Sequence, residues 1–240
     1  MSAAKLTPEN REALKHVSTA TLTTALFKRG LRNVYIQGAQ PLNPAAARMV
    51  GEAYTIRYIP AREDLDHIGV FADPEHPQRK SIEEIPPGHV MVIDGQRDRS
   101  AATGGSILMT RLKVRGAAGL VTDSGLRDTP ELRHMDFPLY AACASAPTNL
   151  TKHHAVDLNV PVGCGGVPVF PGDIIVGDGE GVVVIPAEIA NEIAVEATAM
   201  TIFEDWVEEQ VRGGRSIRGL YPPNAETRAE FDAWKAANKK

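Results

Sequence analysis

The sequence lacks the features that mark several common classes of protein. Two of its 240 residues are cysteine, Cys143 and Cys164, too few for a disulfide framework or a cysteine metal cluster. No apolar run reaches the roughly 18 residues of a membrane span, and the first 17 residues read as a polar helix start rather than a signal peptide. A formal charge of −4 and a pI of about 6.0 give no reason to expect a nucleic-acid partner. We therefore expect a cytoplasmic protein.

The composition is that of an ordinary globular protein, with 43% hydrophobic and 23% charged residues, and the length suits one domain with a full core. Apolar spacing and capping residues predict helices at residues 7–16, 18–29 and 187–211. Alternating or continuous apolar runs predict strands at 49–59, 89–93, 118–122 and 137–142, and several short strands within 160–185. Strands in groups with helices between them predict an α/β fold.

Three further segments complete the expected organisation. Residues 60–88 form a polar, Pro-rich excursion with one short helix, and long ordered loops tend to be functional. Residues 143–158 are predicted to be irregular, with Lys152, His153 and His154 exposed. We expect one domain over residues 1–212. The tail, 213–240, has a Pro-Pro break and a short helix with Phe231 and Trp234 on one side, which we expect to pack on a neighbouring subunit.

The stretch GGSILMTRLKVRGAAGLVTDSGLRD, residues 104–128, has the order turn, helix, strand, turn. A Gly-Gly turn that opens a helix leaves unpaired N–H groups at the positive end of the helix dipole, where a carboxylate or phosphate can bind. The next strand would carry Arg127 and Asp128 back to the same edge of the sheet. The guanidinium could then clamp the anion and the carboxylate could hold a hard cation. The alternative is a packing turn at Gly105, a solvated Arg127 and a helix-capping Asp128.

This stretch resembles the core of the RraA-like proteins, which include the 4-hydroxy-4-methyl-2-oxoglutarate / 4-carboxy-4-hydroxy-2-oxoadipate aldolases. PGDIIVGDGEGVVVIP, residues 171–186, is a second matching block, and VSTATLTTALFKRG, residues 17–30, is a weaker third. The likeness runs from about residue 17 to about residue 209. It implies a β/β/α swivelling-type single domain with helical N- and C-terminal extensions, assembled as a homotrimeric ring or as a hexamer of two rings.

The resemblance also implies roles for individual residues. Gly105, Ser106, Ile107 and Leu108 match the segment whose backbone binds the pyruvate-like end of the substrate. Arg127 matches the substrate-binding arginine. Asp128 matches the ligand of a divalent metal that is mostly coordinated by water, which suits Mg²⁺, with Mn²⁺ or another divalent cation as alternatives.

The implied activity is that of a metal-dependent lyase that cleaves a small 4-hydroxy-2-oxo acid to pyruvate and an aldehyde or oxo acid. Decarboxylation of oxaloacetate would be a side activity. The alternative within the same family is a non-catalytic regulator that restrains a ribonuclease by contact. A regulator needs a surface rather than a metal, so retention of Arg127, Asp128 and the Gly-Gly turn favours the enzyme. No Gly-rich strand-turn supports a methyltransferase.

Departures from the family pattern concern the far end of the substrate. Many members carry an acid where Ser106 stands. Thr24 stands at about the place where aldolase members can carry a glutamate that reaches the next subunit's site. Glu204, in the long C-terminal helix, is a candidate for a second such acid, and a solvated helix face is the alternative. We therefore expect the far end of the substrate to differ here.

The remaining polar candidates are expected to have structural rather than chemical roles. His153 and His154 are expected to form a surface pair, His134 to lie on the surface of a helix, and His67 to lie in the excursion. Asp123 is expected to form a turn, with support of the site as the alternative. Cys164 is expected to be an inert thiol.

Overall fold

The N-terminal residues form two short helices whose caps are visible in the sequence. In the computed structural model, which describes residues 5–238, these are α1 (Pro8–Leu14) and α2 (Thr19–Lys28). The Thr7 hydroxyl accepts a hydrogen bond from the N–H of Asn10 at 3.2 Å, and the Ser18 hydroxyl accepts one from Thr21 at 3.0 Å. Both helices agree with the predicted spans to within two residues, because side-chain capping is a local signal.

A mixed eight-stranded sheet forms the body of the protein, in the order β1-β6-β4-β3-β2-β11-β12, with β8 paired to β2. The neighbouring pairs β2–β3, β3–β4 and β4–β6 are parallel, and the other pairs are antiparallel. Two smaller pairs, β5–β7 and β9–β10, complete the strands. Their bounds are β1 Gln40–Pro41, β2 Met49–Pro60, β3 Val90–Asp94, β4 Gly119–Thr122, β5 Gly125–Leu126, β6 Leu139–Ala141, β7 Cys143–Ala144, β8 His153–Leu158, β9 Val162–Cys164, β10 Val167–Val169, β11 Ile174–Gly177 and β12 Val182–Ile185.

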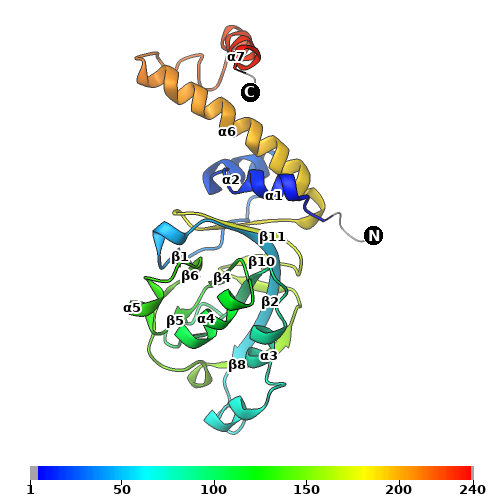
Figure 1. Cartoon of the computed structure of the whole chain (residues 1–240), viewed down its shortest axis with the longest axis vertical. Coiled ribbons are helices and arrows are strands. Elements are labelled where there is room, and N and C mark those ends of the chain that lie inside the picture. The colour runs from blue at the N-terminus through cyan, green and yellow to red at the C-terminus, as the bar shows by residue number, and fades with distance from the viewer. Residues whose placement is uncertain (1–4, 239–240) are drawn as a thin grey trace.

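The long strand β2 joins the parts of this sheet. Its first residues, 49–52, pair with β11, and residues 53–57 pair with β3. Residues 56–60 also pair with β8, with a register irregularity between Arg57 and Tyr58. In Figure 1 the strand therefore curves along the whole height of the body.

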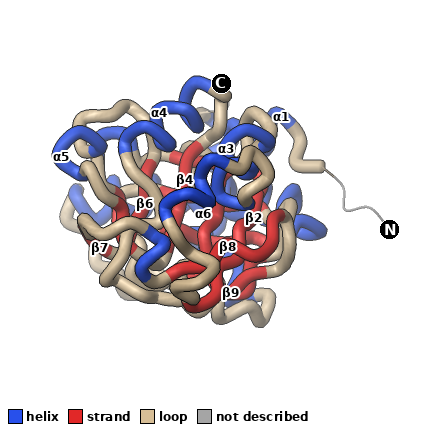
Figure 2. The backbone as a smooth tube through the Cα atoms, turned by 90° about the horizontal axis from the view of Figure 1, so that it is seen from below, coloured by secondary structure: helices blue, strands red, loops and turns tan. Residues whose placement is uncertain are grey.

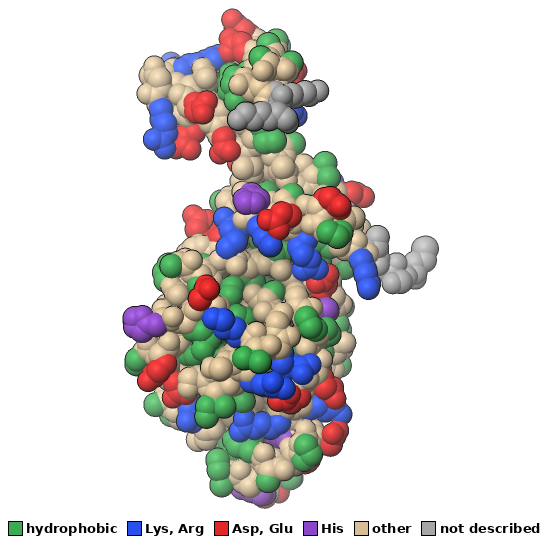
Figure 3. Space-filling view, in the orientation of Figure 1, with side chains coloured by type: hydrophobic (Ala, Val, Ile, Leu, Met, Phe, Trp, Pro, Cys, Tyr) green, Lys and Arg blue, Asp and Glu red, His purple; other side chains and the backbone are tan. Residues whose placement is uncertain are grey.

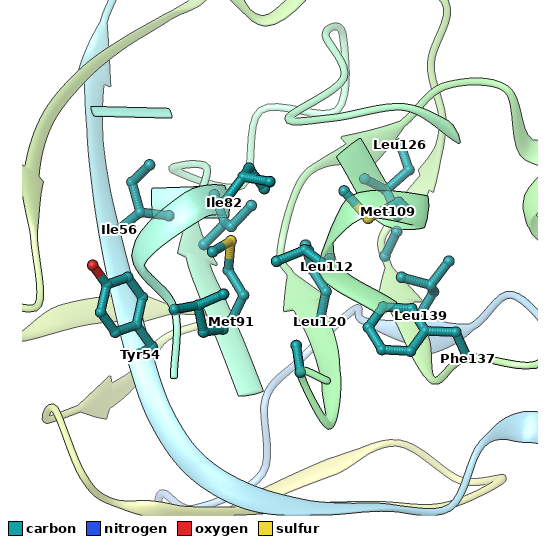
Figure 4. Packing of buried hydrophobic residues seen from close by; sticks show 14 of the residues in the cluster. Tyr54, Ile56, Ile82, Met91, Met109, Leu112, Leu120, Leu126, Phe137 and Leu139 are labelled. Atoms are coloured by element: carbon teal, nitrogen blue, oxygen red, sulfur yellow. The ribbon is translucent and has the colours of Figure 1, made fainter. Parts of the chain in front are cut away.

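Three buried apolar clusters separate the layers of the body. Helices α3 (Pro77–Glu84), α4 (Ser106–Val114) and α5 (Thr129–Leu132) cover one face of the parallel strands. There Met109 and Leu112 of α4 meet Met91, Leu120 and Leu139 of the strands (Figure 4). A second cluster lies between the other face and β9–β10, and a third lies under α1, α2 and α6. Figure 2 shows strands inside and helices around them, which agrees with the α/β prediction.

A helical arm extends from one end of the body. Helix α6 (Ala190–Arg212) has 23 residues, so it is about 35 Å long, and its C-terminal half stands clear of the sheet with α7 (Ala225–Ala237) against it (Figures 1 and 3). Phe231 of α7 lies 5.0 Å from the ring of Phe203 and 5.5 Å from that of Trp206. Phe231 thus packs on a helix of its own chain. Packing of the tail on a neighbouring subunit stays a prediction.

The prediction of irregular structure at residues 143–158 is wrong at residues 153–158, whereas residues 145–147 are irregular and Lys152 is exposed, as predicted. His153–Leu158 form β8, and the His153 side chain is 1% exposed. The strand partner, β2, lies about 100 residues earlier in the chain, so no local signal reveals the pairing. In the excursion 60–88, the expected short helix is α3, and a 3₁₀ turn at Ile68–Ala72 precedes it. In the part of the chain that the structure describes, no helix combines the length and the apolarity needed to cross a membrane.

Candidate functional site

Two loops meet where the parallel strands β3 and β4 end, which is the edge at which open α/β sheets usually bind ligands. The loop after β3 leads to Gly104, and the turn after β4 leads to Arg127. The N–H of Thr103 donates to the carbonyl of Gly125 at 2.8 Å, and the N–H of Arg127 donates to the carbonyl of Gly104 at 3.0 Å. These backbone bonds fix the start of α4 against residues 125–128, as the sequence predicted.

The start of α4 and the side chains of Arg127 and Asp128 approach each other closely at Gly105. A Cβ atom there would lie 2.4 Å from Asp128 Oδ2 and 2.8 Å from Arg127 Cγ, so only glycine fits without displacement of the two side chains. The second glycine of the turn, Gly104, would place a Cβ atom 2.9 Å from the methyl group of Met109. The Gly-Gly turn therefore permits the contact between the helix start and the Arg-Asp pair.

Asp128 is held in a specific orientation. Its backbone is left-handed, with φ 56° and ψ 34°, a conformation that aspartate adopts more readily than most residues. Its Oδ2 atom accepts hydrogen bonds from the N–H of Ser106 at 3.0 Å and from the Ser106 hydroxyl at 3.2 Å. The Ser106 N–H, the Ser106 hydroxyl and the positive charge of Arg127 lower the pKa of the Asp128 carboxyl, which keeps it ionised.

Asp128 occupies the N-cap position of α5, but its side chain makes no capping hydrogen bond. The helix-cap alternative therefore accounts for its position and not for its carboxylate. Thr129 is the first residue of the helix. Oδ1 of Asp128 lies 3.6 Å from Nε of Arg127, and it accepts no hydrogen bond within residues 5–238. This oxygen is free to bind a cation.

The start of α4 offers two further donors. One N–H of the first turn, that of Ser106, is taken by Asp128. Within residues 5–238, the N–H groups of Ile107 and Leu108 have no protein acceptor, because the first bond of the helix runs from Met109 to Gly105. The Ile107 side chain is 82% exposed. An anion at this helix start would meet two backbone donors and the positive end of the helix dipole.

These residues line a cleft of about 150 Å³. The cleft brings together Gly105, Ile107, Leu108, Arg127 and Asp128 of the predicted site. Its other walls come from Gly104 of the predicted turn and from residues that the sequence did not indicate. They are Phe71, Gln78 and Arg79 of the excursion, Ala102 and Gly104, and Thr148 and Asn149. The length of the excursion was the only signal in the sequence that this segment takes part in the site.

The chemistry available in the cleft is limited. Among residues 5–238, Asp128 is its only carboxylate, and no lysine or histidine of that range lines it. Across the described range 5–238, no three His, Cys, Asp or Glu side chains are close enough together to hold a metal. A metal at Asp128 would therefore have one protein ligand and complete its coordination with water and substrate oxygens. That donor set fits Mg²⁺, which keeps several waters and usually takes one or two carboxylates.

Several other candidates lie outside the cleft of their own chain. Thr24 faces a separate hollow with Phe27 and Tyr35, and Glu204 accepts a hydrogen bond from the Thr21 hydroxyl at 2.8 Å. Helices α2 and α6, which carry them, lie above β11 in Figure 1, and α4 lies below it within the body. A solvated helix face therefore does not fully describe Glu204, because its carboxylate accepts a hydrogen bond that links α6 to α2.

The histidines and Asp123 have structural partners. The prediction of a surface pair at His153 and His154 is wrong for His153, which is buried with Nε2 3.0 Å from the carbonyl of Gly95. His154 Nδ1 lies 2.8 Å from Oδ1 of Asp66. Asp123 is 2% exposed and accepts hydrogen bonds from the N–H groups of Gly95 and Gly165, at 2.8 and 2.9 Å.

Asp123 therefore joins two loops and does more than form a local turn. Burial raises its pKa. Burial also raises the pKa of the Cys164 thiol, which makes it a poor nucleophile. His67 and His134 are exposed.

Comparison with known proteins identifies relatives over part of the chain. A protein of Halalkalibacterium halodurans, named as a candidate 4-hydroxy-4-methyl-2-oxoglutarate aldolase, is 40% identical over 108 residues, 45% of this chain and 50% of its own. The 4-hydroxy-4-methyl-2-oxoglutarate aldolase of Thermus thermophilus is 34% identical over 109 residues, 45% of this chain and 65% of its own. The matched segments thus span between half and about two thirds of these relatives.

Solved structures match more of the chain. Streptomyces coelicolor RraAS2, described as an unusual member of the RNase ES inhibitor RraA protein family, is 29% identical with a TM-score of 0.74, over 85% of this chain and 98% of its own. An uncharacterized protein of Pseudomonas syringae is 23% identical with a TM-score of 0.77, over 91% and 99% of the two chains, which supports the fold alone. The family model described as RraA-like, Aldolase/RraA, matches residues 19–184, and the chain belongs to this family.

Proposed function

We propose that the protein is a divalent-metal-dependent lyase that cleaves a small 4-hydroxy-2-oxo acid to pyruvate and an aldehyde or oxo acid. The observation that carries the proposal is the arrangement at the start of α4. There an ionised carboxylate with a free oxygen, a guanidinium and two unpaired N–H groups line one cleft. Relatives named as aldolases support the same reaction.

Arg127 and the helix start would bind the end of the substrate that all such acids share. The planar guanidinium can donate two hydrogen bonds to a carboxylate or to a carboxylate and the adjacent 2-oxo oxygen. The N–H groups of Ile107 and Leu108 would hold the remaining oxygen and fix the orientation of the acid. Asp128 would hold Mg²⁺ or Mn²⁺ through its free Oδ1. When bound, this ion supplies Lewis-acid polarisation of the 2-oxo group.

In the reaction the C4 hydroxyl loses its proton and the C3–C4 bond breaks. C4 becomes the carbonyl of the released product, and the electron pair moves through C3 and C2 onto the 2-oxo oxygen. A proton returned to C3 then converts this enolate to pyruvate. The positive charge of Arg127 and the N–H donors would stabilise the negative charge that develops there. No lysine of the described part of the chain lines the cleft, so the residues of the site do not favour a Schiff-base route. Among the described residues that line the cleft, none besides Asp128 is an acid or base that could accept the C4 proton.

We also propose that the site works in a homotrimer or homohexamer. Two large apolar side chains are exposed in the single chain, Ile107 of the cleft at 82% and Ile68 of the excursion at 74%, and such surfaces usually mark contacts. Sedimentation at micromolar concentration tests this proposal, and a clean monomer would contradict it.

A second candidate function is that of a protein-binding regulator. It is favoured by the Streptomyces coelicolor relative, which is described as belonging to an RNase ES inhibitor family. A regulator does not need the carboxylate of Asp128, so the metal dependence of the chain separates the two candidates.

The experiment is a panel of 4-hydroxy-2-oxo acids with Mg²⁺ in which pyruvate release is coupled to lactate dehydrogenase. We expect Asp128→Asn to lose most of the activity and of the Mn²⁺ affinity, at least about 100-fold, because an amide is a weaker ligand for a hard cation than a carboxylate. Asp136→Asn, an exposed carboxylate after α5, is the matched control. Full turnover in excess EDTA, with no metal retained by the protein, would contradict the proposal.

A further inference from the structure

The excursion 60–88 places a second guanidinium on the cleft. Arg79 lies near the start of α3, and its guanidinium carbon is 4.2 Å from the centroid of the Phe71 ring. Both residues line the cleft together with Arg127. A guanidinium stacked on an aromatic ring is held in one plane, and its N–H donors are then directed at a ligand with less loss of side-chain freedom.

Arg79 differs from the basic side chains around it. Lys80 pairs with Glu75 at 2.5 Å, and Arg111 and Arg115 pair with Glu83 at 2.7 and 3.8 Å. Within residues 5–238, no carboxylate lies within ion-pair distance of Arg79, and its guanidinium makes no hydrogen bond. Partial burial lowers the pKa of Arg79, so its charge is partly desolvated and lacks a counter-charge.

Two buried amides beside it also have unpaired atoms. Gln78 is 4% exposed, and its Nε2 donates to the carbonyl of Thr103 at 2.8 Å, which fixes the orientation of the amide and leaves Oε1 without a partner. Asn149 is 3% exposed, and its Nδ2 has no partner. Buried polar atoms are rarely left unpaired. Both atoms are buried from solvent, so Arg79, and not these amides, is the polar group of this wall that can meet a ligand in the cleft.

With a metal at Asp128, the charges of the cleft favour a ligand that carries a second negative group. Arg79 and Arg127 contribute two positive charges, and Asp128 is the only carboxylate among the described residues of the cleft. A metal at Asp128 would make the excess larger. A monoanionic acid bound at Arg127 would leave Arg79 uncompensated, and a dianionic acid would pair both guanidinium groups.

We propose that Arg79 is a specificity-determining residue that binds a carboxylate at the far end of the substrate, opposite the 2-oxo end. The proposal names the substrate class of the reaction proposed above and rests on it for the chemistry. For binding it rests only on the contacts around Arg79. Uncharged far ends, such as the polyol chain of a sugar-derived acid, would then be poor substrates.

A binding experiment tests the proposal without any turnover. Calorimetry with Mg²⁺ would compare 2-oxoglutarate with 2-oxopentanoate, which has the same chain length and lacks only the second carboxylate. We expect the wild type to bind 2-oxoglutarate roughly 10- to 100-fold more tightly, as a hydrogen-bonded charge pair would give. In Arg79→Gln this preference should fall to within about threefold, while the affinity for 2-oxopentanoate stays the same.

Two variants separate a contact from a change in net charge. Arg62→Gln removes the same charge from the same excursion at an exposed position that pairs with Asp64, and it should keep the full preference. Arg79→Lys keeps the charge and loses the planar fork, so it should keep part of the preference. If Arg79→Gln does not fold, Arg79→Lys is the variant with which the preference is measured.

Turnover gives a separate readout with 4-hydroxy-2-oxoglutarate and 4-hydroxy-2-oxopentanoate, which share the bond that breaks. We expect Arg79→Gln to raise KM for the dianion and to leave kcat/KM for the monoanion unchanged. Equal binding of the two ligands by the wild type, or an equal loss for both in Arg79→Gln, would overturn the proposal. If neither acid is cleaved, the lyase function fails, and the calorimetry still decides whether Arg79 binds a carboxylate.

Discussion

Oδ2 of Asp128 accepts two hydrogen bonds from a single residue, the backbone N–H and the side-chain hydroxyl of Ser106, at 3.0 and 3.2 Å. The two residues lie 22 positions apart and belong to different elements, the start of α4 and the N-cap of α5. This pair fixes one carboxylate oxygen and leaves the other free. Such supporting contacts orient metal ligands and are often as important as the ligands themselves.

Ser106→Ala should therefore weaken metal binding without abolishing it. The N–H of residue 106 still holds Asp128, but the hydroxyl bond is lost and the carboxylate gains freedom to rotate. We expect Mn²⁺ affinity and kcat/KM to fall together by about 10-fold, the lower end of the range for supporting contacts. Ser106→Thr, which keeps a hydroxyl, should retain most of both. Unchanged Mn²⁺ affinity in Ser106→Ala would show that the hydroxyl does not position Asp128.

Gly105→Ala should damage the site through contact alone. The added Cβ atom would lie 2.4 Å from Asp128 Oδ2, so the carboxylate or the helix start must move. We expect a loss of stability of about 1–3 kcal/mol, as for other overpacked positions, and a much larger fractional loss of activity. The control is Gly163→Ala, where a Cβ atom meets no atom within 4 Å. Stability is measured by urea denaturation and activity as kcat/KM. Equally small losses of both quantities in the two variants would contradict this prediction.

Asp123→Asn should destabilise the loops that lead to the site. Its two carboxylate oxygens accept from the N–H groups of Gly95 and Gly165. An amide offers one acceptor, so one buried N–H would face a donor, at a cost of about 1–3 kcal/mol. Urea denaturation at neutral pH, with exposed Asp136→Asn as the control, measures the loss.

The same comparison has a pH dependence of defined sign. Burial raises the pKa of Asp123 in the folded protein above its unfolded value. The folded state therefore gains stability as the pH falls through the folded pKa toward the unfolded pKa of about 3.9. The amide in Asp123→Asn does not titrate, so the stability gap between wild type and variant should widen on acidification. A gap that narrows between neutral and mildly acid pH would show that the pKa is not raised.

Local signals in the sequence predicted most of the fold. The capping residues Thr7 and Ser18 place α1 and α2, and the alternating residues 49–59 mark β2. Strand β8 was missed because its pairing with β2 is non-local, and the His153–Leu158 segment carries little β-branched character. Burial of His153 follows from that pairing, so it could not be predicted from the segment itself.

The residues of the site also divide into those that local sequence signals predicted and those that only non-local packing brings together. The Gly-Gly turn and the Arg-Asp pair lie about 20 residues apart on either side of one helix and strand, so a parallel connection brings them together, and this proximity was predicted. Arg79 and Asn149 reach the cleft from segments distant in sequence, through the packing of α3 on α4 and of residues 148–149 beside residue 102. Only the tertiary structure shows that these residues share a wall with Arg127.

Arg127→Lys separates the enzyme from the regulator. The side chain is 48% exposed and makes one long contact, at 3.6 Å to Asp128, so the substitution should leave the fold and the oligomer unchanged. The charge is kept, and long-range attraction of an anion should survive. What is lost is a planar fork that binds a carboxylate and a 2-oxo oxygen together, which a lysine cannot reproduce. We expect kcat/KM to fall roughly 30- to 1000-fold, corresponding to about 2–4 kcal/mol, for every 2-oxo acid in the panel, because all share that end. Arg133→Lys, on the exposed surface after α5, should have no effect. A folded, metal-binding Arg127→Lys variant with kcat/KM within about twofold of the wild type would show that Arg127 is not the clamp.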